Sequence, residues 1–174
     1  TFKDAAASVQ PYTGAALHLS VAAGIRSDSM AQWLGTERIV RSMPNTPALV
    51  GKGMTALFAR AGVSADDRLT VEQVIATTGE SLWVQAEEQL NAVTALSGPA
   101  YVFFSLEAMT AAGVDMGLSA EQAHRLAVGT FVGASELARA SDEPPAVLRQ
   151  RVTSKGGTTY AAITSMENDN MKEL

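Results

Sequence analysis

The sequence changes its pattern near the middle of the chain, and this change limits the folds that the chain can adopt. As far as about Trp83, short apolar runs alternate with short segments of helical spacing. The runs that predict strands are Leu17–Ala22, Arg38–Met43, Met54–Ala59 and Leu82–Val84, and the segments that predict helices are Ser29–Leu34 and Asp66–Thr78. Strands that alternate with helices predict a parallel or mixed α/β sheet.

Strand signals stop after about Val93, and the rest of the chain has helical spacing throughout. The predicted helices are Pro99–Met116, Ala120–Ala140, Pro145–Val152 and Thr159–Glu167. Short joints that contain Gly, Pro and Ser separate them. The sequence therefore predicts an α/β part followed by an all-α part, as two domains over residues 1–92 and 93–174.

The helices of the second half carry more apolar surface than one small domain can cover. The helix over Tyr101–Met116 has apolar residues all round its circumference, which predicts burial on most sides. The next helix begins with a capping box, formed by Ser119 and Gln122. Its small residues recur at spacings that let helices approach closely, at Ala123, Ala127, Gly129, Gly133 and Ala134. We expect a homodimer through these helices; the alternative is a helical bundle within one chain.

Composition excludes several classes of function. The 174 residues are 47% hydrophobic and 18% charged, with a formal net charge of −5 and no Lys/Arg cluster, which argues against nucleic-acid binding. The chain has no cysteine, so disulfides and thiol chemistry are excluded, and the cytoplasm is the default compartment. No uncharged apolar run is long enough to predict a membrane span. His18 and His124 have no second ligand at metal-binding spacing, so we expect no metal.

A polar hexad, Ser154–Thr159, lies between two predicted helices and is a candidate anion site. Gly156 and Gly157 let the backbone turn with exposed N–H groups, and Thr158 and Thr159 place hydroxyls at the start of the next helix. A small carboxylate could bind these amides at the positive end of that helix. The alternative is an ordinary turn between helices, in which a threonine serves only as the helix N-cap.

Three further turns are rich in small residues, and two of them directly follow predicted strands. These turns are Val21–Gly24, Met43–Ala48 and Ser97–Ala100. Open α/β sheets bind ligands at the carboxyl ends of their strands. With no candidate nucleophile or Walker-type loop in the sequence, such a protein mostly binds and orients, and a cofactor carries out the chemistry.

Four segments together resemble pyrroline-5-carboxylate reductase, in the same order and over nearly the whole chain. They are Leu19–Ile25, Arg41–Ala48, Ala92–Phe103 and Val152–Thr159. The resemblance implies the C-terminal portion of a Rossmann-like dinucleotide-binding domain, followed by a helical dimerisation and substrate-binding domain. It further implies reduction of 1-pyrroline-5-carboxylate to L-proline with NADPH or NADH, and assembly as a homodimer or a ring of dimers such as a decamer.

The resemblance also assigns expected roles to individual residues. The cofactor would lie against Val21, Ala22 and Ala23 and beside Asn45 and Thr46. The substrate carboxylate would bind the hexad through Ser154, Gly156, Gly157 and Thr158. Thr159 is the predicted catalytic residue, through a hydroxyl hydrogen-bonded to the ring nitrogen. Glu87 matches an acidic residue near the substrate, whereas Glu87 and Glu88 by themselves would pass for a solvated helix start.

The sequence departs from the family pattern at three places. Lys155 stands where the family has proline, the segment Leu96–Tyr101 is two residues shorter, and no G-x-G-x-x-G turn is present. We expect part of a longer reductase that begins within a Rossmann helix. The alternatives are a non-catalytic assembly or binding module, and a related imine or β-hydroxyacid reductase. The latter families usually place a catalytic lysine in the helical domain, and Lys155 is the only lysine near a proposed site.

Overall fold

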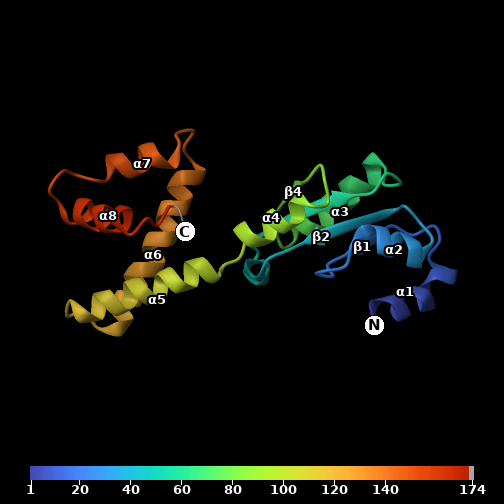
Figure 1. Cartoon of the computed structure of the whole chain (residues 1–174), viewed down its shortest axis with the longest axis horizontal. Coiled ribbons are helices and arrows are strands. Elements are labelled where there is room, and N and C mark those ends of the chain that lie inside the picture. The colour runs from blue at the N-terminus through green and yellow to red at the C-terminus, as the bar shows by residue number, and fades with distance from the viewer. Residues whose placement is uncertain (173–174) are drawn as a thin grey trace. The chain divides into compact units, whose positions relative to one another are not determined.

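The computed structural model describes residues 1–172, and the chain divides into two compact units, Thr1–Val102 and Phe103–Leu174. Among the described residues, strands occur in the first unit only, and the second unit is helical (Figure 1). The expected order, an α/β part followed by an all-α part, is confirmed. The domain boundary between residues 92 and 93 stays a prediction.

The first unit contains a four-stranded mixed sheet. The strands are β1 (His18–Ser20), β2 (Ile39–Met43), β3 (Gly53–Ala59) and β4 (Gly79–Trp83). They lie in the order β1-β2-β3-β4, with β1 parallel to β2, β2 antiparallel to β3, and β3 parallel to β4. The predicted strands are all present, although β4 begins three residues earlier than the apolar run Leu82–Val84 indicates.

Helices in the first unit cover both faces of this sheet. They are α1 (Phe2–Val9), α2 (Ser27–Leu34), α3 (Ala65–Ala76) and α4 (Gln89–Leu96), with 3₁₀ turns η1 (Gln10–Tyr12) and η2 (Thr46–Val50). Ile39 and Val40 are consecutive in β2, so their side chains point to opposite faces. Ile39 packs with residues of α1 and α2, and Val40 packs with residues of α3. The strand is therefore buried on both sides.

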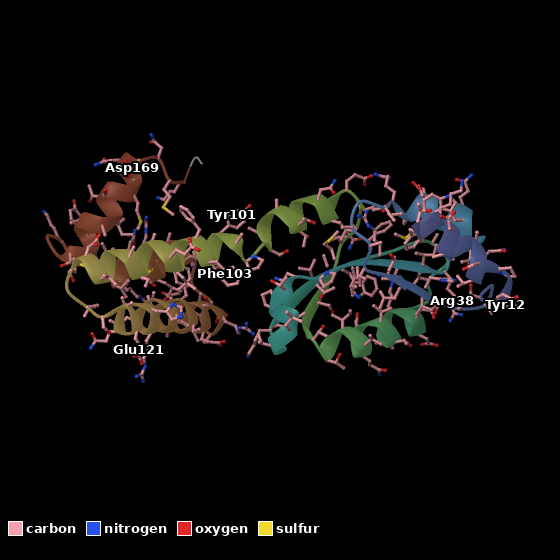
Figure 2. All side chains as sticks on the ribbon, turned by 90° about the horizontal axis from the view of Figure 1, so that it is seen from below. Tyr12, Arg38, Tyr101, Phe103, Glu121 and Asp169 are labelled. Carbon is pink, nitrogen blue, oxygen red and sulfur yellow. The ribbon has the colours of Figure 1, made fainter. Side chains whose placement is uncertain are left out.

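Ion pairs and helix caps fix the ends of these helices. At the start of α3, Ser64 and Asp67 form a capping box. Arg38, labelled in Figure 2, donates to the Asp67 carboxylate, with Nη2 to Oδ1 at 2.6 Å. The hydrogen bonds from Arg38 and from the Ser64 backbone hold the pKa of Asp67 well below its usual range.

The helices of the second half are α5 (Ala100–Asp115), α6 (Ala120–Arg139), α7 (Pro145–Arg151) and α8 (Thr158–Asn168). Each lies within one residue of its predicted bounds. The predicted capping box is confirmed, since Ser119 and Gln122 exchange side-chain and backbone hydrogen bonds. A Cβ added to Gly113 of α5 would lie 2.8 Å from Ala123 Cβ, so small residues do allow α5 and α6 to approach closely.

Within one chain, α5 is not buried on most sides as its composition predicts. Phe103, labelled in Figure 2, is 57% exposed, and Phe104 is 74% exposed. One chain does not supply the cover that these side chains need.

The stretch Gln89–Asp115, which comprises α4 and α5, is long and apolar enough to cross a membrane. The sequence prediction found no such run. Length and composition are weak evidence by themselves, and Ser97–Pro99 interrupts the stretch between α4 and α5.

Candidate functional site

The candidate cofactor residues follow two neighbouring strands at the same edge of the sheet. β1 and β2 are parallel, with Ser20 paired to Arg41, so their carboxyl ends meet there. The Ser42 hydroxyl donates to the Ser20 carbonyl oxygen at 3.1 Å and holds the two strand ends together. The segments that follow, Val21–Ala23 after β1 and Asn45–Thr46 after β2, are therefore neighbours at this edge.

The loop after β1 leaves room for a ligand to approach its backbone. Val21 is 64% exposed, and Ala22 and Ala23 carry only methyl groups. Gly24 has a φ of +75°, and a Cβ there would meet no atom within 4 Å. Within the loop, the Ser20 hydroxyl accepts a hydrogen bond from the Ala22 N–H at 3.2 Å, and the side chains of Ala22 and Ile25 pack against the core beside α1 and α2. Small residues and open space fit the approach of a flat ring or a sugar.

Asn45 is held by structural hydrogen bonds at both ends of its amide. Its Nδ2 donates to the Ser97 carbonyl oxygen at 3.0 Å, and its Oδ1 accepts from the Met54 N–H at 2.9 Å. The side chain thus joins the start of β3 to the turn that follows α4. Thr46, the first residue of η2, is exposed.

Glu87 lies in the turn before α4 and is 6% exposed. Its Oε1 accepts from the Ser27 N–H at 2.7 Å and from Arg41 Nη1 at 2.9 Å, and its Oε2 accepts from the Ser27 hydroxyl at 2.8 Å. Burial raises the pKa of Glu87, but the hydrogen bonds from Ser27 and Arg41 outweigh it and leave the pKa below its usual value. The interpretation of Glu87 as part of a solvated helix start is wrong, because this carboxylate is buried and paired.

Sequence reasoning missed Ser27 and Arg41, the partners of Glu87. Arg41 stands in a strand that is otherwise apolar or small, and its side chain is 6% exposed. A buried arginine needs an acidic partner, which is the signal that could have found the pair. The partner lies 46 residues away, so its identity could not be read from local pattern.

The hexad lies in the second unit and forms an open turn before α8. Gly156 has a φ of +78° with open space around it, and the Gly157 N–H donates to the Ser154 carbonyl oxygen at 3.0 Å. Thr158 and Thr159 are the first two residues of α8, and both are exposed, as is Lys155.

The cap of α8 corrects one alternative. The N-cap is Gly157, and no side chain among the described residues caps this helix. The interpretation in which a threonine serves as the N-cap is therefore wrong. Backbone amides in the first turn of a helix favour anions, so the hexad has the chemistry to hold a carboxylate.

The comparisons with known proteins cover both the strand-end loops and the hexad. The family model described as pyrroline-5-carboxylate reductase dimerisation matches residues 87–174, half of the chain. A pyrroline-5-carboxylate reductase of Pseudomonas aeruginosa is 47% identical over 161 residues, which are 91% of this chain and 59% of that protein. One of Arabidopsis thaliana is 38% identical over 156 residues, or 88% of this chain and 56% of that protein.

Solved structures agree with these relatives. The pyrroline-5-carboxylate reductase of Coxiella burnetii has a TM-score of 0.93 and 37% identity, covering 99% of this chain and 66% of that one. The Plasmodium falciparum pyrroline carboxylate reductase, solved with NADP bound, has a TM-score of 0.90 and 31% identity, covering 99% and 70%. The chain spans somewhat less than three fifths of the two curated relatives' length. On the family match and these likenesses, the chain belongs to the pyrroline-5-carboxylate reductase family.

Proposed function

We propose that this chain carries the substrate site and part of the cofactor site of an enzyme that reduces 1-pyrroline-5-carboxylate to L-proline with NAD(P)H. The observation that carries the proposal is the hexad. It is an exposed, glycine-paired turn at the uncapped start of α8, and it lies within the segment that matches the family model. An open set of backbone amides suits a substrate whose permanent charge is one carboxylate.

In this proposal the hexad binds and orients the substrate. The carboxylate lies against Ser154, Gly156, Gly157 and Thr158. Its backbone donors are the N–H groups of Gly156 and Thr158, because the Gly157 N–H already donates to the Ser154 carbonyl oxygen. The Thr159 hydroxyl hydrogen-bonds to the ring nitrogen and fixes the direction in which the imine carbon faces. Reduction adds a hydride to that carbon and leaves the electron pair of the former C=N bond on nitrogen, which keeps its proton as an amine. Holding the protonated imine in place favours the reaction, because the iminium is the better hydride acceptor.

The cofactor residues of the proposal are Val21, Ala22, Ala23, Asn45 and Thr46. When bound, the dinucleotide would supply the hydride. The small side chains of Ala22 and Ala23 after β1 leave room for it to contact backbone, and the tethered amide of Asn45 keeps the second loop rigid. The NADP-bound relative supports a nicotinamide dinucleotide. Glu87 stays a predicted substrate neighbour.

We further propose that the active form is a homodimer formed through α5 to α8, with a ring of dimers as the predicted higher assembly. The match to a dimerisation family and the exposed phenylalanines of α5 support self-association. The cytoplasm remains the predicted compartment.

Replacing Thr159 by alanine tests the proposal. We expect kcat for NAD(P)H-dependent reduction of pyrroline-5-carboxylate to fall by about 10²-fold, which is the lower end of the loss expected when a positioned proton-transfer or hydrogen-bonding group is removed. Thermal stability should stay unchanged, because Thr159 is exposed and does not cap α8. Ser165→Ala, an exposed hydroxyl loss in the same helix, is the matched control and should leave kcat unchanged. Equal losses of stability and activity in Thr159→Ala would contradict the catalytic role.

The alternative of a binding or assembly module makes a different prediction. A module of that kind would self-associate and bind proline or another small carboxylate, yet the protein would not oxidise NAD(P)H when pyrroline-5-carboxylate is added. Absence of that oxidation, both in the 174-residue chain and in the longest native form of the protein, would reject the reductase.

A further inference from the structure

The loop between β1 and α2 is closed by a buried ion pair at its base. The loop begins after Ser20, whose Cα partner in the neighbouring strand is Arg41. It ends at Ser27, whose N–H and hydroxyl both donate to the Glu87 carboxylate. Arg41 and Glu87 in turn pair at 2.9 Å, so both ends of the loop are attached to one pair.

Glu87 also takes the place of a helix cap. Arg26 is the N-cap residue of α2, and its side chain makes no capping hydrogen bond. The Glu87 carboxylate instead accepts from the N–H of Ser27 in the first turn. An anion at this end of a helix is favoured by the exposed N–H groups and the helix dipole. The exit direction of the loop therefore depends on a residue 60 positions further along the chain.

The carboxylate has little capacity left for a substrate. It accepts three hydrogen bonds from Ser27 and Arg41, and Arg26 Nη2 lies 3.7 Å from its Oε2. Glu87 is also 6% exposed, whereas its neighbour Glu88 is exposed and pairs with Arg26 at 2.8 Å. A buried carboxylate in this state serves to hold protein segments together.

We propose that Glu87 is a positioning residue for the cofactor-binding loop: by joining Ser27 to Arg41, its carboxylate fixes residues 21–26 at the edge of the sheet. The inference rests on the proposed function, because it takes Val21–Ala23 as the cofactor side of the site. It assigns Glu87 to the cofactor, where the family resemblance assigns it to the substrate. Loss of the tether leaves the loop free to sample other conformations, and the dinucleotide must then order it on binding.

Glu87→Gln and Glu88→Gln form a matched pair, because the two carboxylates are adjacent and only the first is buried. In Glu87→Gln we expect the KM for NAD(P)H to rise at least about fivefold while the KM for pyrroline-5-carboxylate stays within about twofold, since only cofactor binding must order the loop. Glu88→Gln should leave both constants within about twofold of the wild type. A rise in the substrate KM alone, or no change in either constant, would overturn the proposal.

Hydrogen–deuterium exchange reads the loop without relying on activity. Amides of residues 21–27 should exchange faster in Glu87→Gln than in the wild type, and their exchange rates should be unchanged in Glu88→Gln. Exchange in other segments should be unaffected in both variants. If the wild type reduces no pyrroline-5-carboxylate, the proposed function fails while this readout still decides whether Glu87 holds the loop. Unchanged exchange of these amides in Glu87→Gln would reject the positioning role of Glu87, whether or not the protein reduces pyrroline-5-carboxylate.

If Glu87→Gln does not fold, Ser27→Ala tests whether the Glu87 carboxylate positions the loop. It removes one hydrogen bond to the carboxylate and leaves the Arg41 pair intact. Faster exchange over residues 21–27 together with a higher NAD(P)H KM would support the proposal, and unchanged values of both would overturn it.

Discussion

Replacing Arg41 by methionine should destabilise the protein, because it leaves the buried Glu87 carboxylate without its charged partner. Both side chains are 6% exposed, with Arg41 Nη1 2.9 Å from Glu87 Oε1. Breaking a buried ion pair of this kind typically costs about 3–5 kcal/mol. Methionine fills much of the space of the arginine stem, so the cavity contribution should be small.

Proton binding sets an upper limit on this cost. The variant can neutralise Glu87, and protonating a carboxyl of ordinary pKa 4.5 at about pH 7 costs about 3.4 kcal/mol, at about 1.36 kcal/mol per pH unit. Ser27 still donates two hydrogen bonds to the ionised form, which lowers the cost of keeping the charge. We therefore expect the free energy of unfolding to fall by about 2–3 kcal/mol near neutral pH.

The cost should depend on pH in a definite direction. In the wild type the pKa of Glu87 is lowered in the folded state, so its contribution is present above the unfolded pKa and is lost as pH falls through the folded pKa. Without Arg41, burial is opposed by Ser27 alone, and the folded pKa of Glu87 rises. The difference between the two proteins should therefore be smaller near pH 4.5 than at neutral pH, and it should close further as pH falls through the lower folded pKa of the wild type.

Urea unfolding at one fixed protein concentration measures this difference at both pH values. Arg26→Met is the matched control, because its guanidinium is 55% exposed, pairs with the exposed Glu88 and lies 3.7 Å from Glu87, so a loss below about 1 kcal/mol is expected. A loss under about 1 kcal/mol at neutral pH, or a loss of the same size at both pH values, would refute the reasoning.

Two further variants test the second unit. Gly133→Leu in α6 should shift the protein toward monomer in analytical ultracentrifugation, because a Cβ there meets no atom of its own chain within 4 Å and the new side chain enters the proposed dimer surface. Gly14→Leu is the control, because Gly14 is equally open but lies in the first unit, and it should leave the dimer intact. An undiminished dimer in Gly133→Leu would count against that surface. Lys155→Gln should raise the KM for pyrroline-5-carboxylate about two- to threefold, since it removes a positive charge from the proposed carboxylate-binding loop. An unchanged KM would mean that the amine faces solvent.

Sequence pattern located the elements whose signals are local. The apolar runs of β2 and β3 and the capping box of α6 depend on neighbouring residues, and each appears within one residue of its expected place. The start of β4 lies outside its predicted place, because Gly79 and Glu80 have no apolar signal. Gly79 pairs with Gly53, and a Cβ on Gly79 would clash with the Gly53 carbonyl oxygen. Such a close approach of two strands is visible only once both are placed.

The candidate site divides in the same way. The glycine turn of the hexad follows from local chemistry, and the positive φ of Gly156 agrees with it. The environment of Glu87 could not be foreseen, since Ser27 lies 60 residues away and Arg41 lies 46 residues away. The hydrogen bond of the Asn45 side chain could not be foreseen either, because its acceptor, the Ser97 carbonyl oxygen, is 52 residues distant. Local signals therefore predict where a loop can bind, and long-range contacts decide how firmly it is held.

The second unit has almost no core of its own. Between residues 103 and 172 the buried residues are Gly113, Ala123 and Ala127, none with a side chain larger than methyl. A segment of this size cannot offset its conformational entropy with so little buried apolar area. We expect another copy of the chain to cover the apolar side chains of α5 that remain exposed, as the match to a dimerisation family supports. Folding of this unit and dimerisation should then be one event. Since the hexad lies in this unit, dilution that dissociates the dimer should abolish the proposed substrate binding together with the helix content of this unit.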